Sequence, residues 1–310
     1  MKFYVLGAGA MGCLYGAGIF RAGCDVTLIH ANEARLNAIN AHGLSVLHNG
    51  AEEILRIDAR RAENCTEPAD YLIVFTKSIS SETALKSVKH LIAPQTTLVS
   101  FQNGLGNDEI LGRYADPDHV IIGTTNLACD MIEDRSIHWI GSGVTNMMTA
   151  SGRVTQSAQI LADVLKEGGL NPVLTDQVFK AIWEKVAFNA AGNSLTAITL
   201  LPFGRMGETS EGKELAHEIV REVIGVANAK GIPADLDHVL ETIDRLMVAH
   251  FDHYSSMLQD VLKGRLTEVE FINGAVVREA AKLGMRVPVT ETLYKLMCIY
   301  QKTYDYRVTV

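Results

Sequence analysis

A glycine-rich turn near the start of the chain constrains the fold more than any other feature. Gly7, Gly9 and Gly12 form a GxGxxG pattern within the segment GAGAMG. A short apolar run, Phe3 to Leu6, precedes the pattern, and a helix-like segment from about Ala10 to Arg21 follows it. A strand, a glycine turn and a helix in this order predict the first part of a βαβ unit that binds a dinucleotide.

The residues of this turn are expected to contact the phosphates of the dinucleotide. Gly7 permits the tight turn, Gly9 lets the backbone approach a pyrophosphate, and Gly12 allows the helix to pack closely on the strand. The pyrophosphate is expected at the helix N-terminus, where backbone N–H groups attract negative charge. The predicted cofactor contacts in the turn are Gly7, Ala8, Gly9, Ala10, Met11 and Gly12. The alternative is that the glycines serve chain geometry alone.

The first half of the chain continues with apolar runs that are typical of parallel strands. Val26 to Ile29 follows the first helix, and a crossover helix lets this second strand run in the same direction as the first. The next strand candidates are Tyr71 to Thr76, Thr97 to Ser100 and Val120 to Ile122, each separated by helical or loop segments. These runs predict an α/β fold that begins with a Rossmann-type, doubly wound parallel sheet.

The second half of the chain is predicted to be all helical. Gly168-Gly169 and Asn171-Pro172 mark a helix end and a short extended piece, after which helical periodicity dominates. We therefore expect a dinucleotide-binding domain at residues 1–172 and a helical domain with the substrate and catalytic residues at 173–310.

A helix with clear end signals is predicted in the last third of the chain. Thr267 and Glu270 have the spacing of a capping box, which would place Glu268 in the first turn of this helix. Gly284 is the expected C-cap, and Pro288 would prevent the helix from continuing. An acid in the first turn complements the helix dipole, which is a purely structural alternative for Glu268.

Charge and cysteine usage exclude several classes of function. The net charge of -8 and the pI near 5.7 disfavour nucleic acid or an anionic membrane as a partner. The five cysteines are scattered and never spaced as CxxC, so we expect neither a disulfide framework nor a zinc or other metal site. With no apolar stretch as long as a membrane span, the expectation is a cytoplasmic protein that acts on a small molecule and can form a homodimer.

The residues after the second predicted strand bear on the choice of cofactor. An NAD site usually offers Asp or Glu at this place for the ribose diol, whereas this chain has His30, Ala31 and Asn32. The missing acid favours NADP, with NAD as the alternative. Arg35, about one helical turn further on, is a candidate partner for the extra phosphate, although a solvated helix residue is the more ordinary interpretation.

Two further polar residues follow predicted strands. Ligands bind beyond the carboxyl ends of the strands in open α/β sheets, so Lys77 and Asn103 are expected to face the dinucleotide and the substrate. The alternatives are a solvated loop lysine and an Asn103-Gly104 turn.

A stripe of polar residues interrupts an otherwise apolar helix predicted over Val178 to Ile198. Lys185, Asn189 and Asn193 follow one another at i, i+4 and i+8, with Thr196 close by, so they share one face of the helix. Burying such groups without partners costs on the order of a few kcal/mol each, and a polar ligand could supply the partners. The alternative is the solvent-facing side of an amphipathic helix.

Three motifs together resemble the ketopantoate reductase family: GAGAMG at the N-terminus, WEKVAFNAAGNSLTA in mid-chain and SSMLQDVLKGRLTEVEFING near the end. The resemblance runs from the first strand to the last third of the chain, and the third motif is far more specific than the first. It implies a Rossmann domain followed by a helical domain, with the active site in the cleft between them. It also implies NADPH-dependent reduction of 2-dehydropantoate to pantoate, a step of pantothenate biosynthesis.

The resemblance assigns roles to individual residues. It implies that Lys185 is the general acid that protonates the carbonyl oxygen, and that Glu268 orients the substrate or the lysine. The implied substrate contacts are Asn103, Asn189, Asn193 and Ser256, with the serine at the substrate carboxylate. Lys77, Asn103 and Glu268 would also border the cofactor. A cationic donor suits the reaction, because hydride delivery creates an alkoxide that must be stabilised and protonated.

The chain departs from the family pattern at two places. The basic residue that many members carry after the second strand is missing, and Leu201-Pro202-Phe203 stands where an asparagine is expected. One alternative is therefore an NADH-dependent 2-hydroxy acid dehydrogenase for other branched or aromatic 2-keto acids. A more distant alternative is a dinucleotide sensor without catalysis, which the presence of Lys185 and Glu268 disfavours.

Overall fold

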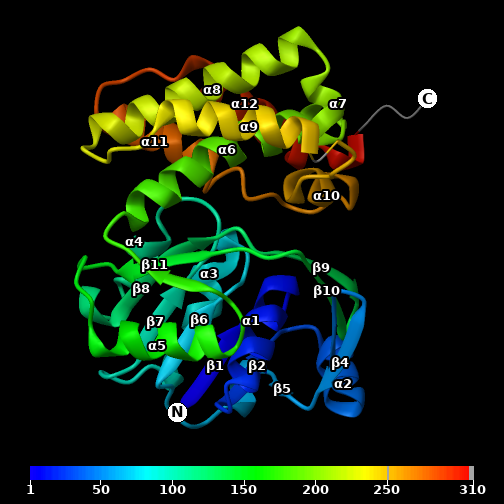
Figure 1. Cartoon of the computed structure of the whole chain (residues 1–310), viewed down its shortest axis with the longest axis vertical. Helices are drawn as coiled ribbons and strands as arrows, with labels where there is room; N and C mark the ends of the chain where they lie inside the picture. Colours follow the sequence, from blue (N-terminus) through cyan, green and yellow to red (C-terminus); the bar gives the residue numbers. More distant parts are fainter. Residues whose placement is uncertain (250, 307–310) are drawn as a thin grey trace. The chain divides into compact units, whose positions relative to one another are not determined.

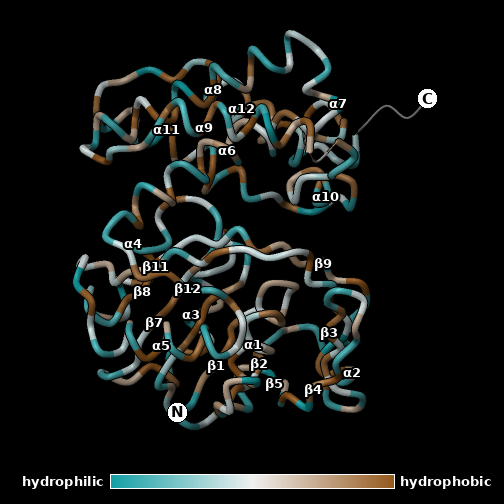
Figure 2. Tube along the Cα trace, in the orientation of Figure 1, coloured by the Kyte–Doolittle hydropathy of each residue, from teal (hydrophilic) through white to brown (hydrophobic). Residues whose placement is uncertain are grey.

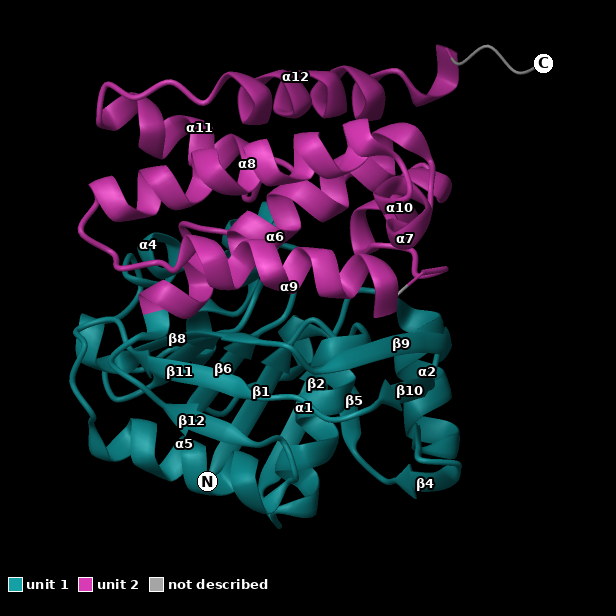
Figure 3. Ribbon diagram, turned by 45° about the horizontal axis from the view of Figure 1, so that its top comes forward, with its two compact units in different colours: residues 1–102, 107–178 teal, residues 103–106, 179–310 magenta. Residues whose placement is uncertain are grey.

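The chain forms two compact units, each with its own core. The computed structural model describes residues 1–249 and 251–306. Unit 1 comprises Met1–Gln102 and Asn107–Val178, and unit 2 comprises Asn103–Gly106 and the chain from Phe179 onward (Figure 3). The short segment Asn103–Gly106 therefore belongs to the unit formed by the C-terminal part of the chain.

Unit 1 is built on a large sheet whose strands run through the first half of the chain (Figure 1). Its strands are β1 (Lys2–Leu6), β2 (Asp25–Ile29), β5 (Asp58–Arg60), β6 (Tyr71–Val74), β7 (Thr97–Ser100), β8 (Val120–Thr125), β11 (Thr145–Thr149) and β12 (Pro172–Leu174). Their spatial order is β12-β11-β8-β7-β6-β1-β2-β5. From β5 to β8 this is the order of the doubly wound dinucleotide-binding sheet, so the predicted fold class is confirmed.

Two features of the strands differ from the sequence-based expectation. β11 pairs with β8 in the antiparallel direction, so the sheet is not wholly parallel. A second sheet with the order β4-β3-β10-β9 was not predicted at all. Its strands are β3 (Leu44–His48), β4 (Ala51–Leu55), β9 (Ala128–Glu133) and β10 (Ser136–Ile140). Its parallel β3–β10 pair joins segments far apart in the sequence, which no local pattern reveals.

The helices of unit 1 connect these strands. They are α1 (Ala10–Arg21), α2 (Glu33–His42), α3 (Ser81–Ser87), α4 (Asn107–Leu111) and α5 (Gln156–Glu167), with short 3-10 turns at Ala62–Asn64, Ser78–Ser80, Lys89–Leu91 and Pro117–His119. The helix α1 has the predicted bounds, and its buried face packs into a core that includes Phe3, Leu28 and Ile73. The strands β1, β6 and β7 are buried almost throughout, and their trace is correspondingly hydrophobic in Figure 2.

The described residues of unit 2 form helices and no strand, as predicted for the C-terminal part. The helices are α6 (Val178–Thr199), α7 (Phe203–Gly207), α8 (Ser210–Ala229), α9 (Leu236–Ala249), α10 (Ser256–Leu262), α11 (Asn273–Lys282) and α12 (Pro288–Lys302), followed by a 3-10 turn at Tyr304–Tyr306. Their apolar faces enclose a separate core that includes Trp183, Ile219, Val276 and Met297. The helix α6, which carries the polar stripe, contributes several of its side chains to this core.

The capping-box prediction at Thr267 is wrong. The helix α11 begins at Asn273, and residues 267–272 form turns in which the Glu268 carbonyl accepts hydrogen bonds from the backbone N–H groups of Phe271 and Ile272. The hydroxyl of Thr267 donates to Gln301 Oε1 at 2.9 Å, a tertiary contact that replaces a helix cap. Glu268 therefore lies before the helix, while Gly284 follows its end at a φ of +67°, as predicted for a C-terminal glycine.

Candidate active site

The glycine turn between β1 and α1 has the geometry required for a close approach of phosphate. Gly7 has a φ of +107°, and a Cβ there would lie 2.6 Å from the backbone nitrogen of Thr76. A Cβ on Gly12 would lie 2.0 Å from the carbonyl oxygen of Gly7, so close packing requires glycine there. By contrast, a Cβ on Gly9 would meet no atom within 4 Å. The first and third glycines thus serve the turn and the packing, and the second faces open space that a phosphate could occupy.

The start of α1 also fits an anion. Gly9 is its N-cap and offers no side chain to the first N–H groups of the helix. Unpaired N–H groups and the helix dipole together favour negative charge at such an end. The residues present therefore fit the pyrophosphate of a dinucleotide, and Ala8, Ala10 and Met11 lie in the same turn.

Two cysteines support the glycine turn, a role that sequence reasoning missed. The thiols of Cys13 and Cys129 donate hydrogen bonds of 3.6 Å to the carbonyls of Ala8 and Ala10, respectively. Burial raises the pKa of the Cys13 thiol to about 12, and burial likewise raises the pKa of Cys129. Both groups therefore remain neutral donors at physiological pH. No spacing signal links them, because Cys129 comes from the distant strand β9.

Arg35 is not a solvated helix residue, so that interpretation is wrong. Its Nη1 donates to the carbonyl of Ala8 at 2.8 Å, and its Nη2 lies 3.5 Å from Asp134 Oδ1. The side chain is only 17% exposed. The pKa of His30 is lowered, first by burial and then by the positive charge of Arg35, while Asp134 opposes this effect. A neutral imidazole and a cation thus lie where the second strand ends.

The ends of β6 and β7 are joined by Gln102. Its side-chain amide donates to the carbonyl of Thr76 at 2.5 Å and to Ser81 Oγ at 2.7 Å. Lys77 is half-buried and begins the turn that follows β6. Gln102 therefore fixes the backbone directly before Lys77 within unit 1.

In unit 2, the polar stripe lies on α6 as predicted. Asn189 and Asn193 are 6% and 7% exposed, and Lys185 is half-buried. The stripe is therefore not an ordinary solvent-facing surface. Most other residues of α6 are apolar or small, and Trp183, Val186 and further side chains contribute to the helical core.

Lys185 and Glu268 interact electrostatically although they are far apart in the sequence. Burial lowers the pKa of Lys185 to about 8, and the negative charge of Glu268 acts in the opposite direction. An ammonium with a pKa close to neutral is poised to donate and recover a proton. Lys185 therefore loses its proton more readily than an ordinary surface lysine.

Asn103 reaches the same acid. Its Nδ2 lies 3.5 Å from Glu268 Oε2, which is a long hydrogen bond. Its position is set by the next residues, because Leu105 N–H donates to the carbonyl of Phe271 at 2.8 Å. Gly104 is required there, since a Cβ would lie 2.4 Å from that same carbonyl oxygen. Packing of this loop on the turn before α11 thus joins Asn103, Glu268 and Lys185 in one cluster.

The predicted substrate residue Ser256 is exposed at the first position of α10, and its neighbour Ser255 is buried. Ser255 caps the helix by accepting from the N–H of Leu258 at 3.1 Å. Its hydroxyl also lies 2.7 Å from the hydroxyl of Thr196, at the end of the α6 stripe. The two serines therefore have different roles. Ser255 caps α10 and joins it to α6, whereas Ser256 is exposed at the first position of α10.

Asn273 is a further polar residue of the helical unit that sequence reasoning missed. Its fully buried Nδ2 donates to the Ala190 carbonyl at 3.1 Å and to Ser194 Oγ at 3.3 Å. These bonds attach the start of α11 to the helix that carries the stripe. The signal in the sequence was the FING segment at the end of the third motif, which was used only for the resemblance.

Phe203 occupies the region where the family pattern led us to expect an asparagine. It is 4% exposed, and its ring lies 5.5 Å from that of Phe188 in a tilted arrangement. A Cβ on Gly192 would lie 2.5 Å from this ring, so Phe203 packs tightly against α6 at Gly192. Phe203 therefore belongs to the core of the helical unit.

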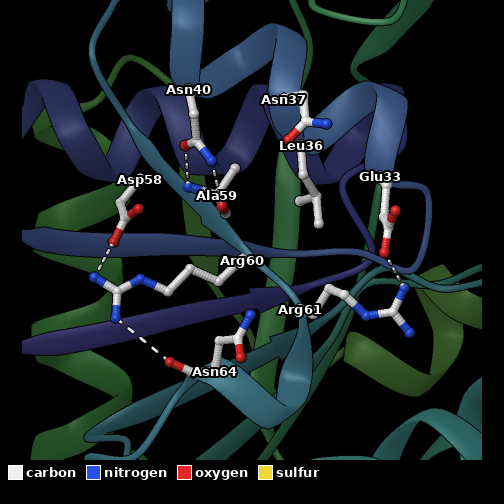
Figure 4. A pocket seen from close by; sticks show the side chains of 9 residues that line it. All are labelled: Glu33, Leu36, Asn37, Asn40, Asp58, Ala59, Arg60, Arg61 and Asn64. Atoms are coloured by element: carbon white, nitrogen blue, oxygen red, sulfur yellow. Dashed lines mark hydrogen bonds and ion pairs between the residues drawn. The ribbon is translucent and has the colours of Figure 1, made fainter.

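A pocket of about 490 Å³ lies elsewhere in unit 1, along α2 and β5. Figure 4 shows its charged side chains directed at one another, Arg60 toward Asp58 and Arg61 toward Glu33. The pocket contains none of the predicted site residues. Arg60 and Arg61 of this pocket already form ion pairs with Asp58 and Glu33, so the pocket attracts an anionic ligand less strongly than the glycine turn does.

Two further classes of site are absent from the described part of the chain. No group of three or more His, Cys, Asp or Glu residues in this part could hold a metal ion. Within residues 1–249 and 251–306, no helix combines the length and apolar character needed to cross a membrane.

Known families and relatives match nearly the whole chain. The model of the ketopantoate reductase PanE/ApbA family matches residues 3–152, and the model of its C-terminal domain matches residues 177–301. The 2-dehydropantoate 2-reductase of Streptococcus pyogenes serotype M1 is 30% identical over 298 residues, covering 96% of this chain and 97% of that protein. The corresponding protein of Archaeoglobus fulgidus is 32% identical and covers 96% of both chains.

A solved structure is also similar over almost the full length. The ternary structure of D-mandelate dehydrogenase with NADH and anilino(oxo)acetate matches with a TM-score of 0.93 and 28% identity, covering 98% of this chain and 100% of that one. The family models, the relatives and the fold agree with the three motifs. The chain therefore belongs to the ketopantoate reductase family of oxidoreductases.

Proposed function

We propose that the protein reduces 2-dehydropantoate to pantoate with NADPH. The observation that carries this proposal is the half-buried Lys185, whose pKa is lowered to about 8 by partial burial against the opposing charge of Glu268. A general acid with this pKa suits ketone reduction near neutral pH. Relatives at about 30% identity that are named 2-dehydropantoate 2-reductase support this choice of substrate.

In this proposal the residues of unit 2 control the proton and the substrate. The dinucleotide, when bound, supplies the hydride that adds to the carbonyl carbon of the keto acid. Lys185 donates a proton to the carbonyl oxygen, so the charge that develops there is neutralised by a cation already in place. Glu268 holds Lys185 by its charge, and Asn103 is bonded to the same carboxylate.

The remaining polar residues of unit 2 are assigned to substrate binding. The amides of Asn189 and Asn193 can donate hydrogen bonds to the hydroxyl and carboxylate oxygens of a small keto acid. Because both amides are buried, leaving them without partners would cost free energy, which such bonds avoid. Ser256, at the start of α10, is assigned to the carboxylate. The proposal that residues 173–310 bind the substrate therefore rests on side chains that can form hydrogen bonds with the oxygen atoms of a small keto acid.

Binding of the cofactor is assigned to the glycine turn Gly7–Gly12 and to Lys77, with Asn103 and Glu268 at its border. We propose NADPH as the preferred form, because no acid follows β2 and the guanidinium of Arg35 lies near that strand end. The residues directly after β2, His30, Ala31 and Asn32, do not include the acid that usually accepts hydrogen bonds from the ribose diol of NADH.

The test is the oxidation of NADPH and NADH, followed by absorbance, with 2-dehydropantoate as the substrate. Turnover with a higher kcat/KM for NADPH is the expected result. A protein that binds either cofactor but does not turn over 2-dehydropantoate would contradict the substrate assignment. A higher kcat/KM with NADH would contradict the cofactor assignment alone.

A second candidate function, a 2-hydroxy acid dehydrogenase for bulkier keto acids, is favoured by one observation and is tested in the same assay. The segment Leu201-Pro202-Phe203 lacks the asparagine that the family pattern led us to expect, and the loss of one polar group suits a less polar keto acid. The similarity to D-mandelate dehydrogenase supports this alternative. A kcat/KM for phenylglyoxylate above that for 2-dehydropantoate would select a 2-hydroxy acid dehydrogenase.

A further inference from the structure

The ribose end of the proposed cofactor site contains an ion pair that the sequence does not reveal. Arg35, in the first turn of α2, lies against the carbonyl of Ala8 in the glycine turn. Asp134 comes from the turn between β9 and β10 in the second sheet, and its Oδ1 lies 3.5 Å from Arg35 Nη2. An acid is thus supplied at the end of β2 by a segment about a hundred residues away.

The two partners of this pair are held very differently. The Arg35 side chain is 17% exposed and is fixed by the 2.8 Å bond to Ala8, whereas the Asp134 side chain is 49% exposed. The 3.5 Å separation is long for a charge-assisted hydrogen bond. Such a half-exposed ion pair contributes little stability and can exchange for another anion. Arg35 is therefore the fixed member, and Asp134 is the replaceable one.

Arg35 also retains hydrogen-bonding capacity. A guanidinium has five N–H donors arranged to meet a carboxylate or a phosphate with two parallel bonds. Its Nε is buried and has no hydrogen-bond partner among the described residues. A phosphate at this place could engage the guanidinium more completely than Asp134 does.

We propose that Asp134 controls the choice between NADPH and NADH by competing with the 2′-phosphate for Arg35. The carboxylate repels a 2′-phosphate and occupies its cation, while it can accept hydrogen bonds from the ribose hydroxyls of NADH. Arg35 favours NADPH, and Asp134 limits that preference. This inference rests on the proposed function, because it requires that the glycine turn binds a nicotinamide dinucleotide.

The decisive variant is Asp134→Asn, studied by fluorescence titration of the full-length protein with NADPH and NADH in the absence of substrate. Removing the competing charge should lower the Kd for NADPH roughly tenfold, which is the effect of about one unit-charge interaction at a partly exposed site. The Kd for NADH should stay the same or rise. Calorimetric titration with 2′,5′-ADP and 5′-AMP should show the same difference, which assigns it to the 2′-phosphate.

Glu133→Gln is the matched control, because Glu133 is the exposed neighbour of Asp134 and its replacement makes the same change in net charge. It should leave both Kd values unchanged. If Asp134→Asn and Glu133→Gln change the Kd for NADPH equally, or if neither changes it, Asp134 does not compete for the phosphate and the proposal is overturned.

The role of Arg35 is tested by a double-variant comparison. Arg35→Gln should raise the Kd for NADPH, and adding Asp134→Asn to it should have no further effect. If Arg35→Gln does not fold, Arg35→Lys, which keeps the charge but loses the paired N–H groups, replaces it. Persistence of the Asp134 effect without Arg35 would reject the competition. Failure of the wild-type protein to bind either dinucleotide would instead reject the proposed function.

Discussion

The hydroxyl groups of Thr196 and Ser255 lie 2.7 Å apart in a buried contact that joins the polar helix α6 to the cap of α10. Ser255 also accepts the N–H of Leu258, so one hydroxyl links the helix cap to the polar stripe. This contact determines where the first residue of α10, Ser256, stands relative to Asn193 on α6.

Thr196→Val should weaken this junction without changing the shape of the side chain. The loss of a buried hydrogen bond costs about 1–2 kcal/mol in the free energy of unfolding. Because Ser256 would be less well placed, KM for the keto acid should rise more than kcat falls. Thr199→Val is the control, since among the described residues Thr199 bonds only to the Leu195 carbonyl of its own helix, and it lies exposed near the helix end. A KM equal in both variants would contradict the assigned role.

Lys185→Ala should lower kcat by roughly 10²–10⁴-fold, the usual contribution of a positioned proton donor. The loss should appear in kcat and kcat/KM alike, because the charge on oxygen develops only toward the transition state. Steady-state kinetics with 2-dehydropantoate and one bulky 2-keto acid provide the measurement. Lys180→Ala, on the same helix and paired with Glu184 instead, is the control and should retain normal turnover. Near-normal kcat in a folded Lys185→Ala protein would refute the mechanism.

The rate of keto acid reduction should fall as pH rises through about 8, because the pKa of Lys185 is lowered to that value and only its protonated form can donate. Oxidation of the hydroxy acid needs the neutral amine as base, so its rate should rise over the same range. In Lys185→Arg the decline in the reduction rate should disappear, since arginine keeps its proton throughout. An unchanged decline in that variant would assign the titration to another group.

Gly9→Asp should abolish dinucleotide binding, because a carboxylate would stand in the open space of the glycine turn and repel the pyrophosphate. Gly9→Ala is the matched variant: its added Cβ meets no atom within 4 Å, so it should fold with an unchanged melting temperature. Fluorescence titration with NADPH compares the three proteins. Wild-type affinity in a folded Gly9→Asp protein would remove the basis for the dinucleotide assignment.

Several predictions from the sequence concern single elements, and these agree closely with the structure. The helix α1 spans Ala10–Arg21 as expected, and β7 spans Thr97–Ser100. The stripe on α6 was recognised because its members recur at helical spacing within one element. The capping-box prediction failed at Thr267 because its hydroxyl bonds to Gln301, a tertiary partner that local sequence cannot reveal.

By itself, the sequence determined the glycine turn and the order of an α/β part followed by an all-helical part. It also determined the candidate residues Lys185, Glu268 and Asn103. All of these features depend on short-range spacing or on a motif. Only the tertiary structure decided that Asn103 bonds to Glu268, and that Arg35 meets Asp134 from a sheet no pattern predicted. These pairs join residues about a hundred or more positions apart. The pKa of Lys185 also belongs to the folded protein, because burial, which only packing creates, is its main cause.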